Sequence, residues 1–469
     1  MSVEVADKEG LNLSGGVSQN GGQNDPQVTI IEEVKSLEIL EPKNFLAELY
    51  GRRVADARPK AQDQILNIAD ATTSANDVRF DNGNDIVDMT RSIVNDAKID
   101  AGDGDNKLRI HDNIEVRGLR FDAGAGNDEI EIRNNVGIKD HTLLYTNDGD
   151  DSVKIYGATM ENAAIHTGLD NDVIDIQRSE IKNGADIRLG GGNDTINTDW
   201  VGFFGDTKIS LSSFTNPNEV DTLNMDNTIF NGHTTIEAND GEKTTMNIKV
   251  CGGDGEIDIK GSHANLDHTP LFDMNFLGPK FMGDVKFDGR NNKVNMHIDD
   301  SEFHGKNNEF YFSDNQNDTL NVTSAIIKNS KFYLGGGDDT VSLTMTRTDI
   351  DNNTQIFGGK GYDTLVLDNN IDFSKVSGFE ELKVTSGAYV TLNGNDLAHL
   401  SDILDNSSNV VKFSEAHGTV KLNGFSETSG AENGYHRYES TYNTHLADGS
   451  EHQGTVYIAV SYTHLRAHE

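Results

Sequence analysis

The sequence predicts an all-β protein, a right-handed parallel β-helix or β-roll-like solenoid with coils of about 22 residues. Turns of the Gly-Asn-Asp type recur at a regular spacing, and apolar residues alternate with polar ones after each turn. Glycine accounts for 47 of the 469 residues and proline for only 6, which suits many tight turns between short strands better than a helical fold.

The turn motif keeps its spacing over two long stretches. Its last position falls at 85, 106, 128, 151, 172 and 194, in steps of 21, 22, 23, 21 and 22 residues. It returns at 318, 339 and 363, in steps of 21 and 24 residues. A period sustained over this length indicates one structural unit stacked many times. Between about 215 and 310 the spacing degrades, and there we expect irregular coils or a loop insertion.

Each repeat carries the pattern of three short strands. Ile130 and Ile132 alternate with polar residues directly after one turn, as Ile174 and Ile176 do after a later one. Alternation with period two indicates a strand with one buried face. Two further short segments follow before the next glycine turn, so we expect three strands in a coil. Neighbouring coils would lie about 4.8 Å apart and bury a core that no coil could bury alone.

Shifts in composition divide the chain into five parts. We expect a disordered leader at 1–28, a helical N-terminal segment or cap at 29–75, and solenoid repeats at 76–370. A compact β-rich C-terminal domain is expected at 371–459. Residues 460–469, VSYTHLRAHE, leave the Gly/Asn/Asp composition and look like a translated sequencing adapter, so the fold prediction excludes them.

The charge and the cysteine content exclude several classes of function. A net charge of -38 makes the chain repel itself unless cations neutralise it, which argues against nucleic acid or an anionic membrane as a partner. Cys251 is the only cysteine, so an intramolecular disulfide and a multi-cysteine zinc site are impossible. No apolar run reaches membrane-spanning length, and the N-terminus lacks the pattern of a cleavable signal peptide.

The turns have the chemistry of a calcium site. Glycine allows positive φ and inward carbonyls, and the closing Asp adds a carboxylate, which together are the oxygen ligands that Ca²⁺ prefers. Carboxylates about 5 Å apart in stacked coils would repel by roughly 3 kcal/mol at an effective dielectric of 20, and a bound cation relieves this. Bare turns with Asn ladders are the alternative. The predicted ligands are Asp85, Asp105, Asp128, Asp151, Asp172, Asp194, Asp318, Asp339 and Asp363, with Gly124, Gly126, Gly190, Gly192, Gly335, Gly337, Gly359 and Gly361.

These turns resemble a known family. Residues 358–365, GGKGYDTL, match G-G-x-G-x-D-x-U, the nonapeptide of the RTX (hemolysin-type) calcium-binding repeat proteins. Residues 123–130, 189–196 and 334–341 match it less one glycine, and the resemblance covers about 300 residues. The family repeats its nonapeptide back to back, giving two turns in each coil, whereas this chain has one. We therefore expect a single column of ions along one edge.

Some copies of the turn depart from the pattern. Asn106 and Asn292 stand where other copies have Asp, and we expect these turns to bind calcium weakly or not at all.

The C-terminal part carries a second resemblance. The order 379–382, FEEL, then 390–397, VTLNGNDL, then 419–425, TVKLNGF, resembles the C-terminal domain of type I secreted RTX exoproteins and adhesins. That resemblance implies an uncleaved C-terminal export signal, the type I secretion machinery as a partner and an extracellular location, as in Gram-negative bacteria. A short helix is expected at 395–400, and strands are expected at 410–413, 419–422 and 456–458.

An enzyme is the main alternative, because parallel β-helices also host polysaccharide lyases and epimerases. The chain has neither the H-E-x-x-H metalloprotease motif nor a G-x-S-x-G nucleophile elbow. The best candidates for a carbohydrate-active cluster are His297, Asp299, Asp300, His304 and Lys306.

One group of neighbouring aromatic residues suggests a platform for a sugar ring. Trp200, with Phe203 and Phe204, is instead interpreted as a bulge or as packing at a rim.

Three function hypotheses follow from the sequence. The first is a secreted structural or adhesive protein whose folding is driven by external calcium, with a host-surface or extracellular polysaccharide ligand as a further partner. The second is a β-helical polysaccharide-modifying enzyme of the lyase or epimerase type. The third is a metal-free solenoid displayed on a cell surface.

Overall fold

The structure is a computed structural model that describes residues 63–461 with short gaps. It confirms the predicted class, a parallel all-β solenoid of about 13 coils with about 22 residues in a repeat and almost no helix among the described residues. The chain divides into two compact units, Met1–Gly241 and Glu242–Glu469, which are described separately. The gaps are 75–76, 81, 212–217, 239, 263–268, 386, 401–409, 414–418, 433–434 and 446–450.

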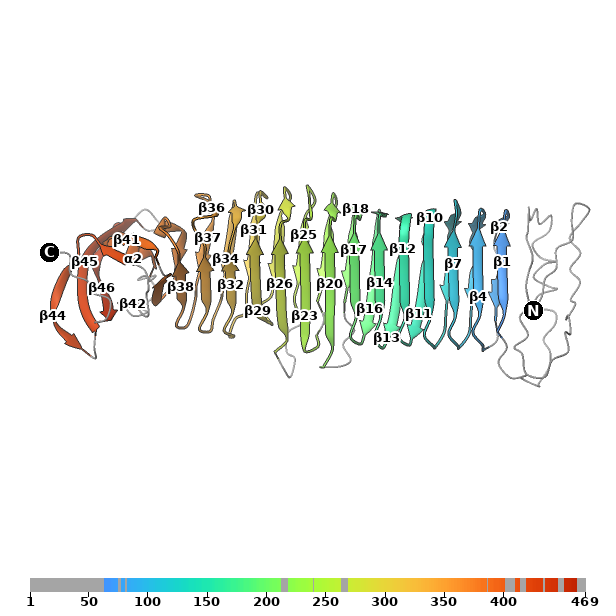
Figure 1. Cartoon of the computed structure of the whole chain (residues 1–469), viewed down its shortest axis with the longest axis horizontal. Coiled ribbons are helices and arrows are strands. Elements are labelled where there is room, and N and C mark those ends of the chain that lie inside the picture. The colour runs from blue at the N-terminus through green and yellow to red at the C-terminus, as the bar shows by residue number, and fades with distance from the viewer. Residues whose placement is uncertain are drawn as a thin grey trace, which may run out of the picture. The chain divides into compact units, whose positions relative to one another are not determined.

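The first unit stacks coils of three short strands, as the sequence predicts. The first two strands of a coil join one parallel sheet and the third joins another; in β10 and β12 the first two are continuous. Figure 1 shows β1, β4, β7 and β10 side by side as successive coils. The strands are β1 (Ile65–Ala69), β2 (Thr72–Ser74), β3 (Asp77–Arg79), β4 (Ile86–Thr90), β5 (Ile93–Asn95), β6 (Lys98–Asp100), β7 (Lys107–His111), β8 (Glu115–Arg117), β9 (Arg120–Asp122), β10 (Glu129–Lys139), β11 (Leu143–Asp148), β12 (Ser152–Glu161), β13 (Ala164–Leu169), β14 (Val173–Gln177), β15 (Glu180–Lys182), β16 (Ala185–Gly191), β17 (Thr195–Asp199), β18 (Gly202–Phe204), β19 (Thr207–Ser210), β20 (Val220–Asp226), β21 (Ile229–Phe230) and β22 (Thr234–Glu237).

Alternate residues of each strand point into the solenoid and stack in register. The parallel pairing places each inward residue beside its equivalent one coil away, so like side chains form buried columns. This core is continuous because every coil covers the apolar face of its neighbour. One column consists of Val87, Leu108, Ile130, Val153, Ile174, Ile196 and Leu223.

The second unit continues the same coil plan and adds a C-terminal part. Its strands from β23 to β40 pair in parallel with the equivalent strand one coil on. Its elements are β23 (Lys243–Lys249), β24 (Gly252–Gly253), β25 (Ile257–Lys260), β26 (Leu271–Leu277), β27 (Lys280–Phe281), β28 (Val285–Asp288), β29 (Lys293–Asp299), β30 (Ser301–Phe303), β31 (Asn308–Tyr311), β32 (Thr319–Val322), β33 (Ala325–Ile327), β34 (Ser330–Tyr333), β35 (Thr340–Leu343), β36 (Thr348–Ile350), β37 (Gln355–Phe357), β38 (Thr364–Leu367), η1 (Phe373–Lys375), β39 (Val376–Ser377), β40 (Glu381–Val384), β41 (Tyr389–Leu392), α2 (Gly394–Leu400), β42 (Val410–Phe413), β43 (Thr419–Leu422), β44 (Ser426–Glu432), β45 (Tyr435–His445) and β46 (Glu451–Ser461).

The core of the second unit contains a cluster of phenylalanine rings among its aliphatic side chains. Phe310 and Phe332 stack with ring centroids 4.5 Å apart, and Phe276 meets Phe303 edge-on at 5.2 Å. Phe276, Phe303 and Phe310 lie in the stretch where the sequence predicts irregular coils or an insertion, and one coil there is lengthened, since Lys243 pairs with Leu271. The strands there nevertheless keep register from coil to coil, since large buried rings fill the space that shorter side chains fill elsewhere.

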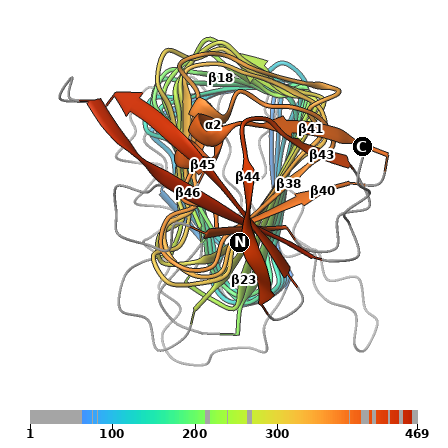
Figure 2. The same ribbon diagram turned by 90° about the vertical axis from the view of Figure 1, so that its left-hand side faces the viewer.

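The C-terminal part contains the predicted short elements. Helix α2 matches the helix expected at 395–400, and the backbone N–H of Phe379 donates to the carbonyl of Leu400 at its end. Strands β42, β43 and β46 match the three predicted strands. Figure 2 shows β45 and β46 as two long strands side by side, and their pairing is antiparallel.

One predicted boundary needs correction. Residues 65–69 and 72–74 are strands β1 and β2, so the solenoid begins before residue 76, inside the segment predicted to be helical. The apolar spacing of ILNIA fits a strand as well as a helix, and the coil that covers it decides the outcome. The leader, the N-terminal helix and residues 462–469 lie outside the described residues.

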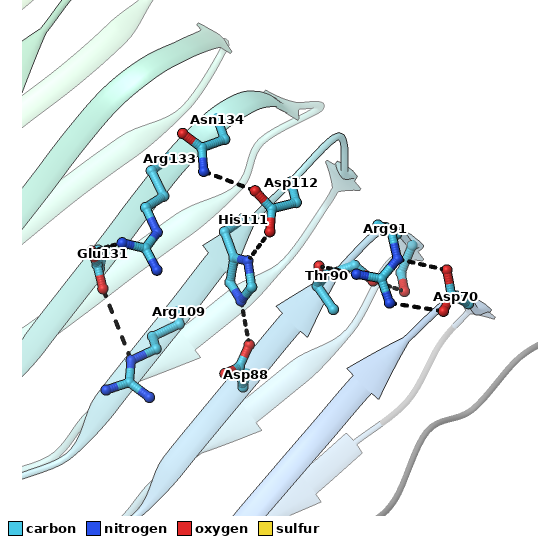
Figure 3. A network of polar contacts seen from close by, with 11 residues as sticks. Asp70, Asp88, Thr90, Arg91, Arg109, His111, Asp112, Glu131, Arg133 and Asn134 are labelled. Atoms are coloured by element: carbon cyan, nitrogen blue, oxygen red, sulfur yellow. Dashed lines mark hydrogen bonds and ion pairs between the residues drawn. The ribbon is translucent and has the colours of Figure 1, made fainter.

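Charged side chains on the outer face pair with side chains one coil away. Arg91 holds the carboxylate of Asp70 through two nitrogens, at 2.8 and 2.9 Å, and His111 lies 2.7 Å from both Asp88 and Asp112 (Figure 3). Each exposed pair contributes little to stability. Together they neutralise part of the acidic surface locally.

No helix among the described residues is long and apolar enough to cross a membrane.

The close stacking of turns predicts unequal costs for two glycine substitutions. Gly104 has φ of 133°, and a Cβ there would lie 2.1 Å from the carbonyl oxygen of Gly83, whereas Gly157 has φ of 65° and open space around it. We expect Gly104→Ala to lower the free energy of unfolding by at least about 3 kcal/mol and Gly157→Ala by about 1 kcal/mol. Urea unfolding in calcium, followed by circular dichroism, checks this; equal costs would contradict the stacked geometry.

Candidate metal centre

A ladder of buried carboxylates runs through the turns of the first unit. At the last position of each turn, one carboxylate or amide oxygen accepts a hydrogen bond from the backbone N–H of the equivalent residue in the preceding coil, over 2.6–2.9 Å. The acceptors are all buried. They are Asp85, Asn106, Asp128, Asp151, Asp172, Asp194 and Asp221.

The second unit repeats this ladder over its last coils. The carboxylates of Asp318, Asp339 and Asp363 accept from the N–H groups of the preceding coils at 2.7–2.8 Å. The N–H of Asp363 donates in turn to Oε2 of Glu380, at 2.7 Å. Glu380 therefore ends the column.

The second carboxylate oxygen has a different environment. In Asp128, Asp194, Asp339 and Asp363 the Oδ2 atom is buried and has no hydrogen-bond partner. A buried acceptor that is left unpaired costs free energy, and a buried unpaired charge costs more. Each of these carboxylates therefore requires either a proton or a cation.

Burial shifts the acidity of these groups accordingly. Desolvation raises the pKa of Asp128 and of Asp172 to about 8 and that of Asp194 to about 7. The same cause raises the pKa of Asp339 and of Asp363 to about 7. Ordinary Asp carboxyls titrate near 3.8, so a neighbouring positive charge would stabilise the ionised form strongly.

Two carboxyls lie beside a threonine. Burial raises the pKa of Asp151 only to about 6, and the Thr146 hydroxyl lowers it part of the way. The Thr167 hydroxyl acts in the same direction on Asp172.

The contacts of Asn106 indicate which groups surround the position that Oδ2 takes in the Asp copies of the turn. Its Nδ2 amide group, which takes the place of Oδ2, donates to the carbonyl oxygens of Gly102 at 3.0 Å, Gly104 at 2.9 Å and Ala123 at 2.8 Å. Three carbonyls thus converge on one point beside the side chain. The amide supplies a positive hydrogen-bond donor where an Asp would supply a negative oxygen.

The same pair of glycines recurs in the Asp copies of the turn. Gly102 and Gly104 have φ of 78° and 133°, and their equivalents are likewise at positive φ, with the second glycine near 135°. The carbonyls that meet the Asn106 amide therefore have counterparts in the turns of Asp128, Asp194, Asp339 and Asp363. The equivalent pairs are Gly124 and Gly126 (93° and 139°), Gly190 and Gly192 (119° and 136°), Gly335 and Gly337 (95° and 134°), and Gly359 and Gly361 (111° and 139°).

These oxygens have the chemistry of a calcium site. Ca²⁺ accepts carboxylate and carbonyl oxygens in flexible geometry, whereas Mg²⁺ demands a near-ideal octahedron. Among the described residues, no three His, Cys, Asp or Glu side chains gather as a metal cluster. A cation in these turns would therefore take most of its protein ligands from the backbone, and the buried Oδ2 atoms and carbonyls fit it.

The structure separates the predicted ligands into three groups. The turns of Asp128, Asp151, Asp172, Asp194, Asp339 and Asp363 each have a buried Oδ2 atom that makes no direct hydrogen bond. Asp85 belongs to the same inner ladder. Asp318 also lies in the ladder, but its Oδ2 accepts from the N–H of Ser313 at 2.7 Å, which makes it a poorer ligand.

Asp105 lies elsewhere. It is exposed, and its carboxylate accepts from the N–H of Asn127 at 2.9 Å in a second, outer ladder of Asn and Asp residues. The predicted period already assigns the inner position of this turn to Asn106, so the prediction of Asp105 as a ligand departed from the repeat. Asp221 and Glu380 are inner acceptors missing from the predicted set; the lengthened spacing of 27 residues between Asp194 and Asp221 obscures the first.

Asn292, the other Asn copy of the turn, forms hydrogen bonds to Ser262 through both polar atoms of its side chain. Its Oδ1 accepts from the N–H of Ser262 and its Nδ2 donates to the Ser262 hydroxyl, both at 2.9 Å. Both polar atoms of this side chain therefore have hydrogen-bond partners without a metal.

The residues considered for an enzyme are distributed over β29, β30 and the following turn. His304 binds Glu302 at 2.8 Å, the Lys306 N–H donates to Asp284 at 2.6 Å, and Asp299 accepts from the Thr323 hydroxyl at 2.5 Å. Each of these contacts ties a side chain or turn to its own strand or to a neighbouring coil.

Comparisons with known proteins give one likeness. No family model matches the chain, and no curated protein matches it. The crystal structure of a hyperactive, Ca²⁺-dependent, β-helical antifreeze protein from an Antarctic bacterium is similar at 17% identity, covering 71% of this chain and 95% of that chain, with a TM-score of 0.43. This likeness is too distant to carry a functional argument, and membership in the RTX family stays a resemblance of motifs.

Proposed function

We propose that the protein is a secreted calcium-binding repeat protein, structural or adhesive at the cell surface or after release, whose folding is driven by external calcium. One observation carries the calcium part of this proposal. The Asn106 amide donates to three converging carbonyls at the point where the Asp copies hold an unpaired, buried carboxylate oxygen.

The proposed ion column follows from that contrast. A neutral amide satisfies the carbonyls by itself, whereas a carboxylate beside the same carbonyls brings oxygen lone pairs together and needs a positive partner. Asp128, Asp151, Asp172, Asp194, Asp339 and Asp363 are the proposed carboxylate ligands. The paired glycines before Asp128, Asp194, Asp339 and Asp363 supply carbonyls.

A metal-free solenoid is the competing explanation, in which each raised pKa simply keeps the carboxyl protonated. The two explanations differ in how the chain responds to calcium near neutral pH. Calcium that binds the folded chain alone stabilises it by mass action, by about 2.7 kcal/mol for each site at a hundred times its Kd. Extracellular calcium modules commonly have Kd of about 10⁻⁴–10⁻³ M, which fits loading only outside the cell.

Export and adhesion rest on the sequence. The C-terminal segments that resemble those of type I secreted exoproteins and adhesins support secretion through that machinery, and the net charge of -38 supports a calcium-rich environment. We further propose that the chain is not an enzyme, since the residues considered for catalysis engage Glu302, Asp284 and Thr323 in local contacts.

A reciprocal exchange at two stacked turns tests the site. We expect Asp128→Asn to lower the calcium bound at saturation by about one ion and Asn106→Asp to raise it by about one, because each swap exchanges an amide donor for a carboxylate. Equilibrium dialysis with elemental analysis measures the bound calcium, and Mg²⁺ serves as the control ion. Unchanged calcium content in both variants would contradict the assignment of these turns.

Melting as a function of pH provides a second test. In the metal-free chain the buried carboxyls have a folded pKa of about 6 to 8, against 3.8 as the ordinary value for Asp. Below pH about 4 both states are protonated and stability is full. As the pH rises through the folded values, ionisation favours the unfolded state. We therefore expect the metal-free melting temperature to fall between pH about 4 and 8.

At the upper end of this pH range, calcium should restore most of the melting temperature that the metal-free chain loses. Thermal melts at several pH values, with calcium or with chelator, measure the effect, and high salt screens the exposed acids so that only the buried ones remain. Melting curves that are identical with calcium and with chelator at pH 8 would refute calcium-driven folding.

A further inference from the structure

Trp200 occupies an unusual position at a corner of the first unit. It lies between β17 and β18 with φ of 55°, and 64% of its surface is exposed. The sequence interpretation as rim packing is right for Phe203, which is buried and stacks on Phe230 with centroids 5.6 Å apart. For Trp200 only the packing part of that interpretation fails, because the ring is exposed.

The same corner carries residues of several kinds in other coils. Asp70 and Asn227 are at φ of 51° and 48° and Gly157 is at 65°, whereas Arg178 and Val250 are at 47° and 51°. Asn, Asp and Gly enter this region readily, and larger side chains bear a backbone penalty there. Trp200 differs from the other residues at this corner in the large apolar ring that it exposes, which does not serve the packing of the coil.

An open hollow of about 590 Å³ lies beside the ring. Phe204 contributes to its lining, and its ring covers Gly202, where a Cβ would come within 2.4 Å of it. Ile229, which is 49% exposed, adds a second apolar side chain. The volume falls in the range of small-molecule sites.

Polar groups border the apolar ones. Arg178 and Asn227 come from the coils on either side of Trp200, at the equivalent corners, and Glu180 lies on β15. Their positions are held by neighbours: Arg178 donates to the Tyr156 hydroxyl at 2.9 Å. Glu180 is paired with Lys182 at 2.6 Å, so the carboxylate is neutralised locally.

We propose that this hollow binds a neutral oligosaccharide, with Trp200 as the platform for one pyranose ring. A pyranose presents an apolar face of C–H groups and a rim of hydroxyls, which match an exposed indole surrounded by guanidinium, carboxylate and amide groups. This inference deepens the adhesive role proposed above by naming the class of ligand.

Other ligand classes fit the hollow less well. Nine residues line it, whereas a stable protein interface takes about 20–30 residues on each side. An anionic ligand would meet a chain of net charge -38. A neutral sugar avoids both problems.

The chain offers a direct readout, because Trp200 is its only tryptophan. Cellohexaose, xylohexaose, mannohexaose and chitohexaose are titrated into the full-length protein in calcium, with polygalacturonate as an acidic comparison. We expect at least one neutral hexasaccharide to shift the emission of Trp200 to shorter wavelength. Calorimetry then measures the same binding in variants that lack the ring.

Two matched variants isolate the platform. Trp200→Asn places at this corner the residue that Asn227 already uses, so folding is preserved, and we expect affinity to fall roughly tenfold or more. Val250→Asn makes the same change at another left-handed, exposed corner, at φ of 51°, and should leave the affinity unchanged. Equal losses in both variants would overturn the proposal.

Further outcomes also overturn it. These are no emission change with any neutral hexasaccharide, a change with polygalacturonate alone, or a sugar-independent dimer in sedimentation that Trp200→Asn abolishes. Melting of the same samples with and without calcium keeps the two proposals apart. A sugar response without calcium-dependent melting refutes only the calcium proposal, and the converse refutes only the sugar site.

Discussion

The hydrogen bond between a buried Asp carboxylate and the backbone N–H one coil before it is the constraint on which the turns depend. It holds the same position in every coil at the same height, because donor and acceptor belong to equivalent residues. The free-energy cost of this arrangement comes from the other carboxylate oxygen. It lies buried among carbonyls, and the tight glycine turns leave no polar hydrogen to meet it.

The chain contains two solutions to that problem. At Asn106 an amide group replaces the oxygen and satisfies three carbonyls from within the protein. At Asp318 the backbone N–H of Ser313 reaches the second oxygen. Asp128, Asp194, Asp339 and Asp363 have neither device. The carboxylates that lack an internal partner are thus the ones for which an external cation is proposed.

Much of this arrangement could be predicted from the sequence, because a fixed period and a two-residue alternation leave few alternatives. The period located the inner positions, and the alternation located the strands. The period also places Asn106, rather than Asp105, at the inner position, so the assignment of Asp105 as a ligand went against the repeat. The structure has Asn106 in the inner ladder and Asp105 in the outer one.

The sequence did not predict where the solenoid begins, nor the hollow beside Trp200, and the two failures have a related reason. Whether ILNIA is strand or helix depends on the next coil, and the exposure of Trp200 depends on a backbone angle that its own sequence disfavours. In both cases the deciding contact comes from a residue about 22 positions away, which local patterns do not register.

The carboxylate ladder also has a direction. Each coil supplies the N–H and the following coil supplies the acceptor, so an unfinished stack always lacks its partner at the C-terminal end. Glu380 fills that place with a longer side chain from outside the repeat pattern. Where successive coils present the same donor and the same acceptor, as from Asp128 to Asp194, whole coils could be gained or lost in evolution without redesigning either neighbour. The length of such a protein can change in steps of one repeat. Only the residue that ends the carboxylate column is fixed.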